Sequence, residues 1–348
     1  MTLVLLVFGL LALALVVVAF WCVHRVPTFQ ISGCCALITG GSQGIGLEIG
    51  RELVRRGARL VVIAARSEKI LQEAVVSLRN EVGTSSSTVA YVVMDVSDQA
   101  AVSRAMEEVG RLVTSCGRMA LDLVVCSAGF AVPARFLDLT PDECRSMMDV
   151  NFFGCVNVVR GVLPTMVNRR SGRIMFISSL AAYCPIAGYS VYSGTKAAIR
   201  ALAHSIDMEY SCFGVRCQVV SPPDVLTPGF DRENTRKSPE CHAISSFGAD
   251  SPVTAQHMAQ QVVRSLQHYR FDTTVGFDKQ LLCWCVSGAQ PATGVIELLL
   301  QMFLNGWVRL AMAVLSRLHY GIVCRVRMAE EEEQAKKSCK GRESKKNA

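Results

Sequence analysis

The hydrophobic and polar residues divide the chain into stretches of different character. Residues 3–23 are apolar almost without interruption, and Thr2 is the only polar residue before them. About 20 apolar residues are enough for a helix to span a bilayer. A cleaved signal peptide, the alternative interpretation, begins with a positive segment that this chain lacks. We therefore interpret residues 1–25 as an uncleaved transmembrane anchor.

Residues 30–277 alternate short apolar runs with amphipathic stretches long enough for crossover helices. Continuously apolar strands that alternate with helices predict an α/β fold, a doubly wound parallel sheet covered on both faces. One helix is expected over 44–57, with Ile45, Ile49 and Leu53 on its inner face and Gly57 as its C-cap. The predicted strands are Cys34–Thr39, Arg59–Ala64, Val89–Met94, Leu121–Cys126, Arg173–Ser178 and Val215–Val220.

Residues 278–324 form a second apolar region, into which Glu297, Arg309 and Arg317 are set. Charged residues are rare in a membrane-spanning helix. The region therefore predicts membrane association, either as an amphipathic helix in the interface or as an imperfect hairpin. Residues 325–348 form a charged tail, Glu-rich and then Lys-rich, which we expect to be disordered.

The composition narrows the class of protein. Hydrophobic residues make up 51% of the 348 and charged residues 19%, which favours a membrane-associated protein. The net charge of +7 is spread along the chain, without a basic stripe interleaved with aromatic residues, so nucleic acid is not an expected partner. The 15 cysteines are scattered; Cys283-Trp284-Cys285 is no metal framework. We expect reduced thiols and no metal site.

A glycine-rich turn joins the first strand to the helix over 44–57. Its sequence is Thr39-Gly40-Gly41-Ser42-Gln43-Gly44-Ile45-Gly46. Glycines there allow a tight turn in which backbone N–H groups at a helix N-terminus approach a pyrophosphate. A strand–turn–helix context favours a dinucleotide site over an ordinary glycine-rich loop. The expected cofactor contacts in the turn are Gly40, Ser42, Gln43, Gly44, Ile45 and Gly46.

The end of the second strand indicates which dinucleotide is bound. An acidic residue there would hold the ribose hydroxyls of NAD, but this chain has Ala65 and then Arg66. A guanidinium fits a 2′-phosphate, so we expect NADPH, unless Arg66 is only a solvated surface charge. Asp95, after the third strand, is placed either to touch the adenine or to cap the next helix.

Tyr192 and Lys196 lie four residues apart at the start of a predicted helix, which puts them on one face. A nearby ammonium lowers the pKa of a phenol, which is otherwise near 10. The spacing alone is common on solvated helix faces. Ser178 and Ser179 strengthen the catalytic interpretation of Tyr192 and Lys196, because they end the preceding strand at the sheet edge where ligands of such folds bind. Asn151 lies in the long helix before that strand, where a buried amide needs partners.

With these motifs the chain resembles the short-chain dehydrogenase/reductase family over roughly residues 30–275. The resemblance implies a Rossmann sheet in 3-2-1-4-5-6 order with a seventh strand. It implies that Tyr192 passes a proton, Lys196 lowers its pKa and binds the nicotinamide ribose, Ser179 polarises the carbonyl, and Asn151 holds a relay water. The family usually has Asn before Ala128-Gly129, where this chain has Cys126-Ser127, so one contact that supports the cofactor loop is in doubt.

The run Ser221–Phe230, with Pro222-Pro223 in place of the usual Pro-Gly, is similar to that of the reductases of long-chain sphingoid ketones within this family. That likeness implies hydride transfer from NADPH to a C3 ketone, with Thr227 at the nicotinamide carboxamide and Lys69, one position from the expected basic residue, at the phosphate. The rivals are a membrane reductase of steroids or retinoids and a catalytically silent scaffold protein. The sequence leaves open whether a homo-oligomer forms.

Two features predict the subcellular location and orientation of the protein. Arg25, the first positive residue, follows the apolar run, which favours a cytosolic catalytic domain. Lys345 and Lys346 resemble the dilysine signal that returns membrane proteins to the endoplasmic reticulum, which is read from the cytosol. A chance pair in a lysine-rich tail is the alternative. We expect an endoplasmic reticulum membrane protein that is in contact with membrane lipid and faces the cytosol.

Overall fold

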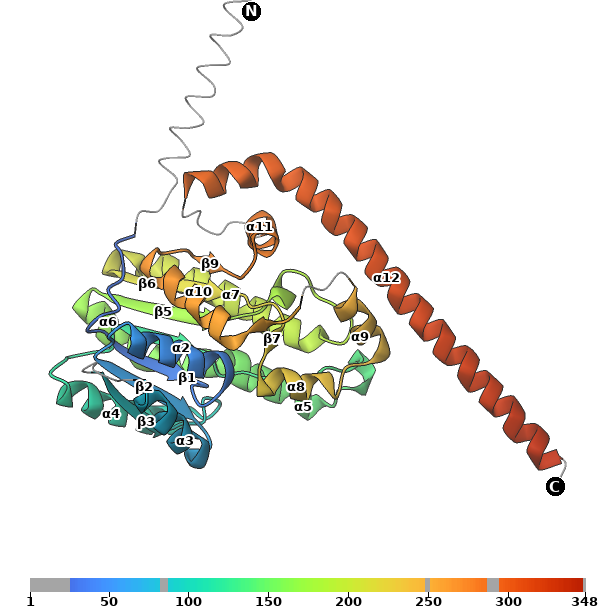
Figure 1. Ribbon diagram of the computed structural model, residues 1–348, viewed down its shortest axis with the longest axis horizontal. Coiled ribbons are helices and arrows are strands. Elements are labelled where there is room, and N and C mark those ends of the chain that lie inside the picture. Colours follow the sequence, from blue (N-terminus) through green and yellow to red (C-terminus); the bar gives the residue numbers. More distant parts are fainter. Residues whose placement is uncertain (1–25, 82–86, 248–250, 287–293, 347–348) are drawn as a thin grey trace, which may run out of the picture.

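One parallel sheet of seven strands forms the centre of the computed structural model, which describes residues 26–81, 87–247, 251–286 and 294–346 (Figure 1). The strand order is β3-β2-β1-β4-β5-β6-β9. The strands are β1 (Cys35–Thr39), β2 (Leu60–Ala65), β3 (Thr88–Val93), β4 (Leu123–Cys126), β5 (Gly172–Ile177), β6 (Val215–Val220) and β9 (Asp272–Thr273). All six predicted strands are confirmed to within about two residues, and the order is the one that the family resemblance implied.

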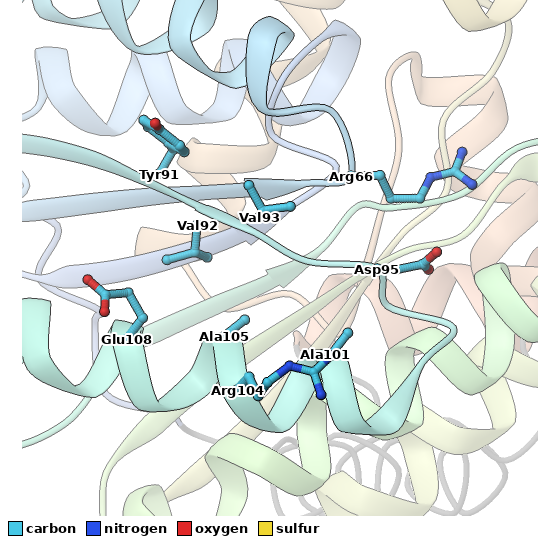
Figure 2. Close-up of a pocket in the computed structure, with 9 residues that line it drawn as sticks. All are labelled: Arg66, Tyr91, Val92, Val93, Asp95, Ala101, Arg104, Ala105 and Glu108. Atoms are coloured by element: carbon cyan, nitrogen blue, oxygen red, sulfur yellow. The ribbon is translucent and has the colours of Figure 1, made fainter.

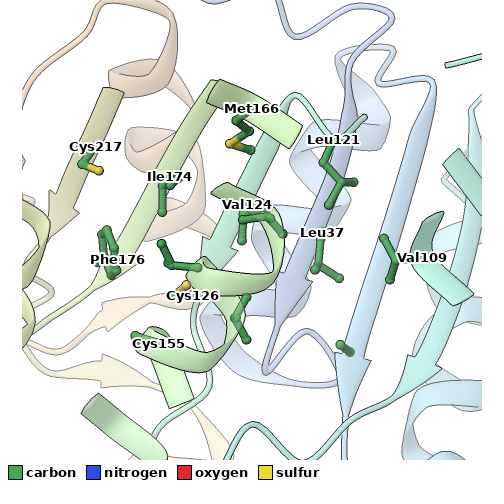
Figure 3. Packing of buried hydrophobic residues seen from close by; sticks show 14 of the residues in the cluster. Leu37, Val109, Leu121, Val124, Cys126, Cys155, Met166, Ile174, Phe176 and Cys217 are labelled. Atoms are coloured by element: carbon green, nitrogen blue, oxygen red, sulfur yellow. The ribbon is translucent and has the colours of Figure 1, made fainter. Parts of the chain in front are cut away.

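Helices cover both faces of this sheet. On one face lie α2 (Gly44–Arg55), α3 (Glu68–Arg79) and α10 (Ala255–Gln267); on the other lie α4 (Gln99–Ser115), α6 (Gly154–Arg169) and α7 (Ser190–Tyr210). Successive residues of a strand point to opposite faces, so in β1 Leu37 packs under α4 and α6 whereas Ile38 packs under α2. Figure 3 shows the first of these layers. Double coverage explains why the strands are apolar at every position.

The predicted helix over 44–57 is α2. Ile49 and Leu53 are fully buried and Ile45 is partly buried, as the spacing predicts. Gly57 follows the helix with a φ of +79°, a left-handed conformation that favours glycine. The C-terminal end of the helix is therefore set by the local sequence.

Three short helices follow the carboxyl ends of β4 and β6: α5 (Pro141–Met148), α8 (Pro228–Asn234) and α9 (Pro239–Ser246). Each begins with proline after a Ser or Thr whose hydroxyl accepts a hydrogen bond from the first turn. Such a cap and a proline at the first helical position favour helix initiation. A small parallel pair, β7 (Val225–Leu226) and β8 (Val253–Thr254), lies beside them.

The C-terminal part consists of α11 (Phe277–Val286) and one continuous helix of 52 residues, α12 (Val295–Lys346). A hairpin within residues 295–324 is therefore wrong, because the helix is unbroken there. The predicted disorder of the charged tail is also not what the structure has, because α12 continues to Lys346. A Glu333–Lys337 ion pair, one turn apart, supports the helix there.

The long helix α12 packs against α11 and α9, and its C-terminal end extends past α9 away from the domain (Figure 1). Ile322 is buried, and His319 makes an edge contact with Phe247. Arg135 bonds both oxygens of Glu240 on α9 and also pairs with Glu330 on α12, at 2.6 Å. These contacts attach the middle of α12 to the domain that contains the sheet.

Two helical stretches in the described part of the chain are long and apolar enough to cross a membrane by length and composition. The first, Pro141–Arg169, joins α5 to α6, and its apolar side chains form part of the core. The second, Val295–Gln334, has an apolar window that is not buried at all. The predicted N-terminal anchor, residues 1–25, lies outside the described residues.

Candidate active site

The glycine-rich turn has the geometry that its sequence predicts. Gly40 and Gly44 have φ values of +65° and +59°, and a Cβ on Gly46 would lie 2.5 Å from the Gly40 carbonyl oxygen. Gln43, the N-cap of α2, makes no side-chain hydrogen bond to the first turn. The backbone N–H groups at this helix start are therefore not capped by Gln43, which is the arrangement that accepts phosphate oxygens. The turn fits a dinucleotide pyrophosphate.

A pocket of about 670 Å³ lies between the end of β3 and α4 (Figure 2). Arg66 and Asp95 line it, and the Arg66 guanidinium is exposed and forms no ion pair within the described part of the chain. Asp95 accepts hydrogen bonds from the N–H and the hydroxyl of Ser97, whereas Asp98 caps α4. The alternative of Asp95 as the helix cap is thus wrong. Lys69 is exposed in the first turn of α3 and does not line the pocket.

The helix α7 brings Tyr192 and Lys196 together, one turn apart. The Lys196 ammonium nitrogen lies 5.6 Å from the centre of the Tyr192 ring and donates to the Ile177 carbonyl oxygen at 2.9 Å. Ser179, the second residue after β5, makes a side-chain hydrogen bond with Tyr192. Ser178 is buried and instead donates to the Lys196 carbonyl oxygen. The structure therefore brings three of the predicted catalytic residues to one point.

Asn151 lies in a π-helical turn (Asp149–Phe153) between α5 and α6, rather than within a regular long helix. Its buried amide accepts from the Phe130 N–H at 3.0 Å and donates to the Phe130 carbonyl and to the Thr195 hydroxyl. A Cβ on Gly129 would lie 3.0 Å from the Asn151 amide oxygen and 3.2 Å from the Lys196 ammonium. Asn151 thus joins the loop after β4 to the catalytic helix, and its relay water stays a prediction.

The loop at Cys126-Ser127 is supported although the usual asparagine is missing. The Thr39 hydroxyl accepts hydrogen bonds from the N–H groups of Ser127 and Ala128, at 3.2 and 3.3 Å. A Cβ on Gly40 would lie 2.8 Å from the Ala128 backbone. The loop therefore packs directly against the glycine-rich turn, and Thr39 supplies the support that the sequence left in doubt.

Thr227 lies beside the glycine-rich turn. Its methyl group would lie 3.2 Å from a Cβ on Gly44. Its hydroxyl accepts from the Phe230 N–H at 3.1 Å, which caps α8, and keeps its own proton available to a ligand. Its hydrogen bond to the nicotinamide carboxamide stays a prediction.

Burial determines the protonation of the catalytic pair. It raises the pKa of the Tyr192 phenol above its ordinary value, Glu233 adds to the rise, and the Ser179 hydroxyl opposes it. Burial also lowers the pKa of Lys196. This direction for Tyr192 is the opposite of the expected one, because desolvation of the phenolate outweighs any stabilisation by the ammonium. The phenol is thereby kept in the form that donates a proton.

Two further residues lie at this centre that the sequence did not single out. The Tyr189 ring lies 5.6 Å from the Tyr192 ring, centre to centre, and its hydroxyl donates to Glu233 on α8 at 3.0 Å. Glu233 is half-buried and raises the pKa of both Tyr192 and Lys196. Residues 189 and 233 are 44 positions apart, so no local spacing could have revealed their contact.

The family model of the short chain dehydrogenases matches residues 34–238, the segment that carries the glycine-rich turn and the catalytic helix. The chain belongs to the short-chain dehydrogenase family. It is therefore an oxidoreductase that acts on a ketone or an alcohol with a nicotinamide dinucleotide.

Curated relatives and a solved structure agree. The chain is 31% identical over 284 residues to a 3-ketodihydrosphingosine reductase of Bos taurus, covering 80% of this chain and 82% of that protein. It is 32% identical over 286 residues to a 3-dehydrosphinganine reductase of Danio rerio, with the same coverage. A solved short chain dehydrogenase/reductase family protein is 26% identical, with a TM-score of 0.58, and covers 71% of this chain and 97% of its own.

Proposed function

We propose that this short-chain dehydrogenase reduces the C3 ketone of 3-ketodihydrosphingosine to dihydrosphingosine with NADPH. The observation that carries the proposal is the likeness to reductases of this ketone over four-fifths of the chain, combined with a complete Ser179, Tyr192 and Lys196 centre. A catalytically silent scaffold would have no need for that centre.

The residues of the site have separate roles in the proposed reaction. When bound, NADPH supplies the hydride that adds to the C3 carbon. The Tyr192 phenol donates its proton to the ketone oxygen, and the Ser179 hydroxyl polarises that oxygen. The phenolate then regains a proton from solvent, so one hydride and one proton yield the alcohol. Lys196 and Asn151 hold the cofactor side of the site, beside Gly129.

NADPH is preferred over NADH in this proposal because of Arg66. Its exposed guanidinium has no carboxylate partner in the described part of the chain, and it shares a pocket with Asp95 (Figure 2). A 2′-phosphate would provide that partner through charge-assisted hydrogen bonds. Lys69, exposed nearby on α3, would add a weaker attraction.

A membrane location is also part of the proposal. The exposed side chains Phe303, Trp307, Leu310, Val314 and Leu318 recur every three or four residues, so they share one face of α12. α12 is held against the domain by its contacts with α11, α9 and Arg135. These contacts favour a helix that lies in the membrane–water interface over one that crosses the bilayer. Arg25, Lys345 and Lys346 are the basis for proposing the cytosolic face of the endoplasmic reticulum. An active site at that membrane surface lies close to a long-chain lipid substrate in the bilayer.

Purified full-length protein in detergent micelles should oxidise NADPH when 3-ketodihydrosphingosine is added. Steroid ketones and retinal, assayed in parallel, should give far lower kcat/KM values. Equal or higher activity on a steroid or on retinal would overturn the substrate assignment while leaving the reductase chemistry intact.

A further inference from the structure

A half-buried carboxylate, Glu233, lies at the catalytic centre. Glu233, on α8, accepts one hydrogen bond, from Tyr189, and forms no ion pair within the described part of the chain. Lys237, on the same segment, lies instead over the Phe230 ring, 4.7 Å from its centre. Burial raises the pKa of Glu233, because desolvation disfavours the carboxylate more than the charges of Lys237 and Lys196 stabilise it.

The position of Glu233 relates it to the catalytic pair Tyr192 and Lys196. It is reached from Tyr192 through Tyr189, whose ring packs on that of Tyr192, and it acts electrostatically on Tyr192 and Lys196. Arg66 and the glycine-rich turn, which would hold the cofactor phosphates, belong to the other half of the sheet, before β4. Glu233 therefore borders the place where a ketone must lie to receive the Tyr192 proton.

We propose that Glu233 binds the ammonium group on the carbon next to the ketone and makes the enzyme selective for 2-amino ketones. This inference rests on the proposed function, because it concerns the same substrate. The ammonium and the ketone oxygen sit on neighbouring carbons, so an anion that binds the first must lie beside the groups that bind the second. Glu233 is the half-buried carboxylate in that position, whereas Asp224, which also acts on Tyr192, is exposed.

A bound ammonium would complete the hydrogen bonding of Glu233. A carboxylate has two acceptor oxygens, and Tyr189 uses one of them. Hydrogen bonds between charged groups in a desolvated site are stronger than neutral ones, and an ammonium offsets the cost of burying the carboxylate. Carbonyl compounds without the amine, such as steroid ketones and the aldehyde retinal, would not pair with that charge and so would bind less well.

The test compares two substrates in the full-length enzyme: 3-ketodihydrosphingosine and the same long-chain ketone with hydrogen in place of the amine. Glu233→Gln keeps an acceptor for Tyr189 and removes only the charge. It should lower kcat/KM for the amino ketone by about 10- to 100-fold more than for the ketone without the amine, the range for a hydrogen bond to a charged group. Asp231→Asn, on the same helix but exposed, is the matched control and should change neither value.

Equal losses on both substrates, or no loss on either, would overturn the role of Glu233. Glu233→Asp should keep the preference for the amino ketone, which separates loss of charge from loss of fold. If Glu233→Gln does not fold, the ratio of kcat/KM values for the two substrates is measured in the wild-type enzyme. It should favour the amino ketone by a similar factor, and the absence of a preference would contradict the proposal. A wild-type enzyme inactive on the amino ketone but active on other carbonyls would instead reject the proposed function itself.

Discussion

The Lys196 ammonium and the Tyr192 ring face each other at 5.6 Å, yet the phenol keeps a raised pKa because it is buried. The ammonium is also held by the Ile177 carbonyl, at 2.9 Å. In the absence of ligands the pair thus holds a protonated phenol, ready to act as an acid, beside a fixed cation.

Replacing Tyr192 with Phe should remove turnover and leave NADPH binding nearly intact, because only the hydroxyl supplies the proton. General acid catalysis contributes about 10²–10⁴-fold, which sets the expected loss in kcat. Steady-state kinetics measures the loss, and nicotinamide fluorescence checks binding. A folded Tyr192→Phe protein that retains more than a tenth of the wild-type rate would contradict the assignment.

Arg66→Asp should move the cofactor preference from NADPH toward NADH. An aspartate repels the 2′-phosphate and accepts hydrogen bonds from ribose hydroxyls, and we expect the ratio of kcat/KM values to change by about 10- to 100-fold or more. Lys69→Gln is the comparison and should change the ratio less, since Lys69 lies outside the pocket. An unchanged ratio in Arg66→Asp would mean that Arg66 is only a surface charge.

Arg135→Met should destabilise the attachment of α9 and α12. The Glu240 side chain is almost fully buried, so loss of its partner should lower the free energy of unfolding by about 2–4 kcal/mol. The control Arg145→Met breaks an exposed pair with Asp142 and should change it by less than about 1 kcal/mol. Chemical denaturation measures the free energy of unfolding of both variants. An equal loss in the two would show that the buried pair stabilises the protein no more than the exposed one.

The same pair predicts a pH dependence. Arg135 holds the pKa of Glu240 at about 2, below its ordinary 4.5. A depressed carboxyl pKa contributes stability that is present above the unfolded pKa and is lost as the pH falls through the folded one. The difference between wild type and Arg135→Met should therefore shrink between about pH 4.5 and pH 2. Unfolding midpoints across this range provide the measurement, and a constant difference would contradict the pairing.

A tag appended at Ala348 should be digested by protease added to intact microsomes. If α12 lies in the interface, as its contacts with α9 and Arg135 favour, the tail stays on the side of the catalytic domain. A cytosolic marker protein and a lumenal one provide the controls. Protection of the tag while the cytosolic marker is cleaved would require α12 to cross the bilayer.

Much of the site followed from local sequence. The strands, the glycine-rich turn and the face shared by Tyr192 and Lys196 depend on contacts within a few residues, whose periodicity and φ requirements are visible in the chain. The pattern could not decide whether Asp95 touches the adenine or caps the next helix; the cap is Asp98, a second short acidic residue near the same helix start.

What the sequence by itself determined is the doubly wound sheet and the place of the dinucleotide turn, since burial on both faces makes each strand apolar and a phosphate turn requires glycine. Only the tertiary structure decided which polar groups meet at the catalytic centre. Glu233 meets Tyr189 although the two are 44 positions apart, and Arg135 bridges α9 and α12 across distant segments. The raised pKa of Tyr192 has the same origin: it depends on how much of the protein surrounds the phenol, which no spacing along the chain records.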